Sequence, residues 1–81
     1  MIEEHVDHRR HEPADLQRAL IVNTLRTHGP MTADELDVTL DWRETTSGRR
    51  LKEAENMGRV RRTGVTRPTR SGRNAEVWEA A

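Results

Sequence analysis

A helix start in the middle of this chain constrains its fold more than any other feature of the sequence. Thr32 and Glu35 form the T-x-x-E pattern of a capping box, in which the hydroxyl and the carboxylate each accept a hydrogen bond from a free backbone amide. Ala33, Leu36 and Leu40 follow at helical spacing and form one narrow apolar side. The pattern predicts a short helix that begins directly after Thr32.

A further helix is expected across a tight turn. Asp41 and Glu44 are spaced to cap it, and its helical pattern extends to Met57, just before a glycine. Leu51 and Ala54 mark the inner side of this helix, whereas polar side chains are expected to point away from it: Thr45, Arg49, Lys52, Glu53 and Asn56. A short capped helix, a turn and a helix with a polar outer side are typical of a helix-turn-helix.

The segment before this pair predicts one more helix, from about Pro13 to His28, with Gly29 and Pro30 ending it. Its apolar residues spread around most of the helix: Leu16, Ala19, Leu20, Ile21, Val22 and Leu25. A helix of this kind lies in the centre of its domain. The alternative is that Leu16 and Leu20 form a homodimer contact.

After Gly58 the pattern changes from helix to strand. Residues 59–63 and 75–79 predict two short strands, and residues 64–74 between them are rich in Gly, Pro, Ser and Thr. Two strands joined by a long basic loop form a wing. The expected fold class is therefore α+β, mainly α: a winged helix-turn-helix with three helices followed by a two-stranded β-hairpin, over residues 12–81.

Residues 1–11 have no apolar period and are expected to form a flexible or frayed arm. His5, His8 and His11 have a spacing that metal sites use, but no cysteine completes a ligand set. Solvated histidines are therefore the preferred interpretation, and no metal is expected. The acidic arm residues Glu3, Glu4 and Asp7 suggest a further hypothesis, in which the arm folds over the basic wing and competes with DNA.

Composition excludes several function classes. The chain has 81 residues and no cysteine, so disulfides and thiolate chemistry are excluded. The sequence has no nucleophilic triad, phosphate-binding glycine loop or paired carboxylates in an apolar setting, so we expect no enzyme activity and no cofactor. No apolar run reaches the roughly 20 residues of a membrane span, and no signal-peptide pattern is present, so a cytoplasmic protein without a membrane partner is expected. Trp42 and Trp78, the two aromatic residues, are expected in the core.

Charge is divided unevenly along the chain. The net charge is zero overall, but residues 1–42 hold nine acidic and four basic side chains, and residues 43–81 hold five acidic and ten basic ones. From Arg59 to Arg73 there are six arginines and no acidic residue. This asymmetry indicates a surface that meets phosphate. A merely solvated charged segment is the alternative.

The stretches HGPMTADEL, TTSGRRLKEAENMGRVRRTG and TRPTRSGRNAEVW resemble small winged helix-turn-helix DNA-binding proteins of actinobacteriophages. They are more distantly similar to the winged helix of multiple-antibiotic-resistance regulators. The resemblance implies a phage transcriptional regulator or accessory factor that binds double-stranded DNA in the bacterial host cytoplasm. It places a recognition helix at residues 44–57. Ser47, Ala54 and Arg59 stand where such helices carry larger apolar residues, so the third helix is expected to be weakly anchored.

Distinct roles follow for the candidate DNA-binding residues. Arg49 would pair with a guanine edge in the major groove, while Thr45 and Thr46 would bond a phosphate or touch a thymine methyl. Lys52, Arg61 and Arg62 would position the protein on phosphates. On the wing, the minor groove or the flanking backbone would be contacted by Arg67, Arg70 and Arg73.

A different class of function also fits the sequence. In this alternative, the winged helix is an interaction module that binds a host or phage protein and does not read DNA. The overall neutrality, the acidic first half and the weakened third helix favour it.

Overall fold

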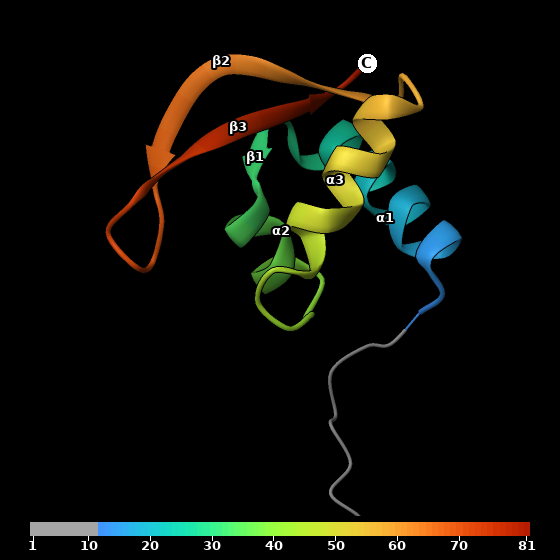
Figure 1. The fold of residues 1–81 in the computed structure, drawn as a ribbon, viewed down its shortest axis with the longest axis horizontal. Coiled ribbons are helices and arrows are strands. Elements are labelled where there is room, and N and C mark those ends of the chain that lie inside the picture. The colour runs from blue at the N-terminus through green and yellow to red at the C-terminus, as the bar shows by residue number, and fades with distance from the viewer. Residues whose placement is uncertain (1–11) are drawn as a thin grey trace, which may run out of the picture.

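The computed structural model describes residues 12–81, which form three helices and a three-stranded antiparallel sheet (Figure 1). The predicted α+β class with three helices is confirmed. The expectations for the arm, including its histidines and acidic residues, lie outside the described residues. In chain order the elements are α1 (Ala14–His28), β1 (Met31–Thr32), α2 (Ala33–Thr39), α3 (Thr46–Asn56), β2 (Val60–Pro68) and β3 (Asn74–Ala80).

The sheet has the order β1-β3-β2, so the prediction of two strands was wrong. In the additional strand β1, Met31 pairs with Trp78 and Thr32 pairs with Val77. A strand of two residues is too short to show the alternating pattern that identifies strands in a sequence. Its pairing with β3 connects the start of α2 to the centre of the sheet.

The hairpin of β2 and β3 is longer than predicted, and its loop is shorter. Residues 64–68, expected in the loop, belong to β2, whose last pair is Pro68 with Asn74. Proline is tolerated there because β2 is an edge strand and needs no hydrogen bond on its outer side. The register shifts between Arg62 and Thr66, around Gly64, which has a φ of 88°. In Figure 1 the hairpin extends beyond the helices, and its turn lies far from the C-terminus.

The capping box at the start of α2 is confirmed. The Thr32 amide donates to Glu35 Oε1 at 2.9 Å, and the Glu35 amide donates to Thr32 Oγ1 at 3.1 Å. The predicted start of α3 was wrong, because the helix begins at Thr46. Asp41 and Thr45 have φ angles of 57° and 73°, and these left-handed residues prevent a continuous helix from starting earlier.

The core lies between the three helices and the sheet. The prediction of a central α1 holds only for its inner side, because Ile21, Val22 and Leu25 are buried but Ala19 is exposed. Trp42 and Trp78 are each 5% exposed, which confirms their assignment to the core. The other buried apolar residues are Ile21, Val22, Leu25, Met31, Leu36, Leu40, Leu51, Ala54, Val60 and Val77. Leu16 is 46% exposed, so it does not belong to this core.

Of the three positions at which the resembled proteins carry larger apolar residues, two are buried in this structure. Ser47 and Ala54 are completely buried, so small side chains fill these places in α3. Arg59 is exposed, and the next residue, Val60, is buried in its place. Among residues 12–81, no helix has the length and apolar character needed to cross a membrane.

Candidate nucleic-acid interface

One side of α3 faces solvent and carries positive charge. Arg49, Lys52 and Asn56 are exposed on this side, while Leu51 and Ala54 are buried on the opposite side. Within the described part of the chain, the side chains of Arg49 and Lys52 have no hydrogen-bond or ion-pair partner. Their charges are therefore available to an external anion.

Glu53 does not share this outer side, contrary to the prediction. Its Oε1 lies 2.6 Å from Arg18 Nη1 on α1 and 2.8 Å from Arg50 Nη1 on α3. Arg18 also pairs with Asp15 at 3.2 Å. These contacts join α3 to α1 and remove the negative charge of Glu53 from the exposed side of α3.

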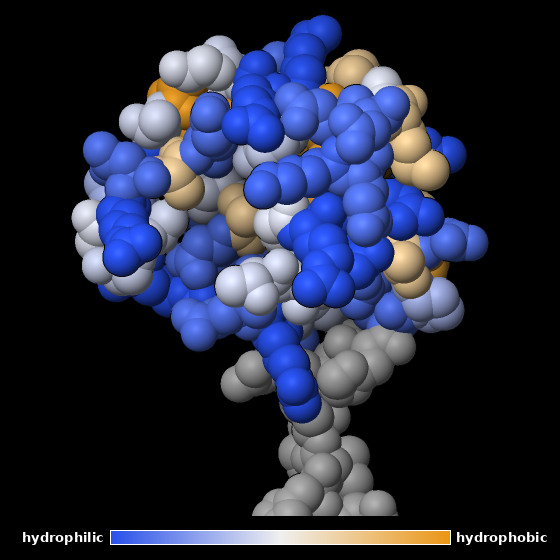
Figure 2. Space-filling model, in the orientation of Figure 1, coloured by the Kyte–Doolittle hydropathy of each residue, from blue (hydrophilic) through white to orange (hydrophobic). Residues whose placement is uncertain are grey.

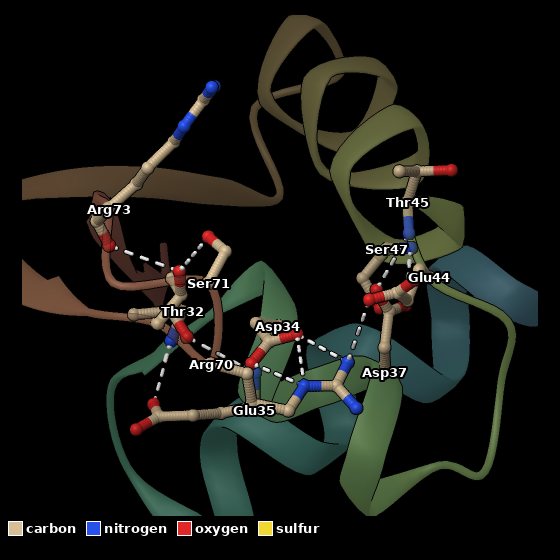
Figure 3. Close-up of polar contacts among 11 residues, drawn as sticks. Thr32, Asp34, Glu35, Asp37, Glu44, Thr45, Ser47, Arg70, Ser71 and Arg73 are labelled. Carbon is tan, nitrogen blue, oxygen red and sulfur yellow. Dashed lines mark hydrogen bonds and ion pairs between the residues drawn. The ribbon is translucent and has the colours of Figure 1, made fainter.

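The buried carboxylate of Asp37 holds the beginning of α3. Asp37 is 2% exposed, and its oxygens accept hydrogen bonds from the amides of Thr45 at 3.1 Å and Ser47 at 2.8 Å (Figure 3). Burial raises the pKa of Asp37 above its ordinary value, although these hydrogen bonds oppose the shift. The cap predicted from Asp41 and Glu44 is therefore supplied by a residue of the preceding helix.

Two of the three wing arginines are held by acidic residues of α2. Arg67 Nη1 lies 2.6 and 2.8 Å from the carboxylate oxygens of Glu35, and Arg70 Nε lies 2.8 and 2.9 Å from those of Asp34. A longer contact of 3.8 Å joins Arg70 to Glu44. Figure 3 shows the Arg70 guanidinium beside Asp34 and directed toward α3.

These pairs shift the titration of the groups involved. Hydrogen bonding by Arg70 lowers the pKa of Asp34, and the same pair raises the pKa of Arg70. For Glu35, partial burial would raise the pKa, but the hydrogen bonds from Arg67 and Thr32 outweigh burial and lower it. Both carboxylates are therefore charged at neutral pH and oppose the wing arginines.

The third wing arginine has a different environment. Arg73 lies in the turn, where its backbone oxygen accepts from the Thr69 amide at 2.8 Å and from Thr69 Oγ1 at 3.0 Å. Its guanidinium has no partner within residues 12–81, and Figure 3 shows it pointing away from the pair of Arg70 and Asp34. The wing therefore presents Arg73 without an internal counter-ion.

The remaining predicted phosphate-binding residues lie on β2. Arg61 contacts Glu79 at 2.7 Å. Arg62 contacts Glu55 at 3.1 Å and Glu76 at 3.4 Å, and its guanidinium carbon lies 4.7 Å from the centre of the Trp78 ring. Hydrogen bonding to Glu55 raises the pKa of Arg62. Both arginines are neutralised within the fold, and Arg62 covers the buried tryptophan.

Two clefts flank the start of α3, each with a volume of about 400 Å³. The first lies between α3 and the wing turn, and Thr45, Gly48, Thr69 and Ser71 are among its lining residues. The second lies between α1 and α3 and has a polar lining: Gln17, Arg43, Glu44, Thr45, Thr46, Arg49 and Arg50. The clefts thus meet at Thr45, on the two sides of the exposed N-terminal part of α3.

Figure 2 shows that the face seen in Figure 1 is predominantly hydrophilic, with apolar residues scattered over it. Within residues 12–81, no group of three or more His, Asp or Glu side chains could hold a metal ion. No protein-family model matches the chain, and a search of curated proteins finds no match.

The structure therefore gives the predicted site residues different environments. Arg49, Lys52 and Arg73 are exposed and unpaired within the described residues, whereas Arg61, Arg62, Arg67 and Arg70 are ion-paired. Thr45 lines both clefts, whereas Thr46 lines only the one between α1 and α3.

The role of Asp37 was missed, although a signal was present. Asp37 follows Leu36 and precedes Leu40, so it falls on the inner side of α2, where a carboxylate requires buried partners. The cleft residues Gln17 and Arg43 were also missed. They come from α1 and from the loop before α3, and no local pattern in the sequence connects them.

Proposed function

We propose that this protein is a winged helix-turn-helix DNA-binding protein, with α3 as its recognition helix. The observation that carries the proposal is the exposed pair of Arg49 and Lys52, which have no counter-ion within residues 12–81, although most arginines around them are paired. The order of α1, β1, α2, α3 and a final hairpin also supports it. As the sequence resemblance predicts, we propose that it acts as a phage transcriptional regulator or accessory factor.

In this proposal α3 lies in the major groove of double-stranded DNA. Arg49 reads a guanine through its planar guanidinium, and Lys52 contacts a phosphate. The polar cleft between α1 and α3 receives the backbone on one side of the groove through Gln17, Arg43 and Thr46. Arg73 meets the backbone on the other side, from the turn of the wing.

The experiment is a DNA-binding titration of the full chain over a salt series. We expect the double variant Arg49→Gln/Lys52→Gln to bind DNA more weakly. The plot of log K against log salt concentration should also become less steep, by about 0.9 for each phosphate that the variant no longer neutralises. Sequencing of bound fragments from a random pool would then identify the site.

Arg26→Gln/Arg59→Gln is a matched control, because it removes the same charge. Both arginines are exposed and line a separate groove with Asn23 and Ala81. We expect this control to weaken binding less than the α3 variant. Equal losses in the two variants would show that only net charge matters and would refute a recognition role for α3.

A protein-interaction module is the second candidate. The neutralised wing favours it, because Arg67 and Arg70 already have internal partners. Exposed apolar side chains, including Val38 on α2 and Val65 on β2, add surface that a protein could cover. A wild-type protein that does not bind any DNA at low salt would support this candidate over the first.

A further inference from the structure

Two arginines of the wing are bound by carboxylates of α2, which occupy the positions that DNA phosphates would take. Asp34 and Glu35 lie in the first turn of α2, while Arg67 lies near the end of β2 and Arg70 lies in the hairpin turn. Each guanidinium contacts both oxygens of its carboxylate, at distances of 2.6 and 2.8 Å for Arg67 and of 2.8 and 2.9 Å for Nε of Arg70. Arginine also binds a phosphodiester through two oxygens.

We propose that Asp34 and Glu35 are positioning residues that hold Arg67 and Arg70 in place of DNA phosphates, so that the DNA backbone must displace them to engage the wing. The inference rests on the proposed function. It predicts a free protein whose wing is closed on α2, with Arg73 as the wing arginine that has no partner within the described residues.

Glu35 gives this arrangement a fixed geometry. Its Oε1 accepts from the Thr32 amide at 2.9 Å in the capping box and also contacts Arg67 at 2.6 Å. The carboxylate therefore cannot follow the arginine away from α2 without breaking the cap. Arg70 is shared between Asp34 and, at 3.8 Å, Glu44, so it faces negative charge from both α2 and the loop before α3.

One of the two competing carboxylates, that of Asp34, also lies in a cleft beside α3. The cleft between α3 and the wing turn is lined by Asp34 and Arg70 together with Thr45 and Gly48 of the α3 side. A backbone strand entering this cleft would meet the Asp34 carboxylate unless Arg70 moved from it to the phosphate. The Asp34–Arg70 pair therefore reduces the binding free energy that Arg70 would otherwise contribute on contact with a phosphate.

The test is a double-variant cycle measured by DNA binding. Asp34→Asn/Glu35→Gln removes the two charges, and glutamine retains the acceptor that the capping box needs. We expect this variant to bind DNA about two- to thirty-fold more tightly than the wild type, the range expected when two exposed ion pairs are removed. Adding Arg67→Gln/Arg70→Gln should abolish that gain, whereas the same arginine changes should cost less in the wild type.

Asp15→Asn/Asp41→Asn is the matched control. It changes the net charge equally at two exposed positions that do not contact Arg67 or Arg70. A gain in the control equal to that of Asp34→Asn/Glu35→Gln would overturn the inference. So would an equal loss from the arginine changes in both backgrounds. In either case, weaker binding by Arg49→Gln/Lys52→Gln would leave the proposed function intact.

A second measurement follows the carboxylates directly. Carbon NMR of Asp34 should show a carboxyl pKa below the ordinary value in the free protein, a return toward that value in Arg70→Gln, and a rise when DNA is bound. An unchanged Asp34 titration in the saturated DNA complex would show that phosphate does not displace the carboxylate and would overturn the inference. Absence of DNA binding in every variant would refute both the proposed function and this inference.

Discussion

The buried Asp37 provides a strong test of how this fold presents α3. Asp37→Ala would remove two charge-assisted hydrogen bonds, from the amides of Thr45 and Ser47 at 3.1 and 2.8 Å. Hydrogen bonds to charged groups contribute about 1.5–3 kcal/mol each. The variant also relieves the cost of burying a carboxylate, which opposes part of this loss. We therefore expect Asp37→Ala to lower the free energy of unfolding by about 2–4 kcal/mol.

This effect is large for a chain of this size. A domain of 81 residues has a total stability of roughly 4–12 kcal/mol. The assay is urea unfolding followed by tryptophan fluorescence, because Trp42 and Trp78 are both buried and become exposed on unfolding. Hydrogen exchange should also show faster exchange of the Thr45 and Ser47 amides in the variant.

Asp37→Asn separates hydrogen bonding from charge. The asparagine side chain retains one acceptor oxygen, but its NH2 group faces the second backbone N–H, which then has no acceptor. We therefore expect a smaller loss of unfolding free energy than in Asp37→Ala. Asp41→Ala is a control at an exposed residue. Its effect on the free energy of unfolding should be limited to the cost of placing alanine in a left-handed conformation. If Asp37→Ala unfolds within about 0.5 kcal/mol of the wild type, the range of ordinary surface substitutions, the carboxylate does not hold α3.

Three further predictions concern stability. Thr32→Ala should lower the free energy of unfolding by about 1 kcal/mol, because the capping box loses its hydroxyl; an unchanged urea midpoint would contradict this. Gly48→Ala on α3 should raise stability by about 0.5–1 kcal/mol, whereas Gly64→Ala should lower it by about 1–2 kcal/mol, since both sites have room for a methyl but only Gly64 has a positive φ. Thermal unfolding of the two glycine variants should therefore shift in opposite directions. Acidification below the ordinary carboxyl values of 3.8 and 4.5 should weaken the fold as Asp34 and Glu35 are protonated, because their lowered pKa values mean that the folded state favours the charged forms. The raised pKa of Asp37 has the opposite effect, because its contribution to stability is lost as the pH rises above 3.8. Asp37→Asn removes this contribution, so its stability should fall more steeply on acidification than that of the wild type. A shallower fall would contradict the raised pKa.

Most of the helical framework could be predicted from local sequence. The capping box of Thr32 and Glu35 and the end of α1 before Gly29 depend on residues within one or two helical turns of each other. The two tryptophans were placed correctly because a chain with few large apolar residues must bury them. The start of α3 could not be placed in this way, because its cap comes from Asp37 in the preceding helix and from the left-handed turn between them.

The candidate site was predicted less completely than the framework. Its α3 residues followed from helical spacing, and Arg49 and Lys52 indeed lie on an exposed side. The run of arginines after Gly58 predicted a basic wing, but it does not reveal which acidic residues neutralise them. Arg67 is 32 residues from Glu35, and Arg70 is 36 residues from Asp34, so neither pair is visible in the local sequence.

The sequence by itself determined where α1 begins and ends, where α2 begins, that a basic hairpin follows α3, and that the two tryptophans are buried. These properties depend on backbone conformation and on apolar area, both of which are encoded by residues close together in the chain. Only the tertiary structure decided that β1 pairs with β3, that Asp37 holds α3, and that Asp34 and Glu35 hold the wing. These features depend on contacts between distant segments, and such contacts form only when the core has brought the helices and the sheet together.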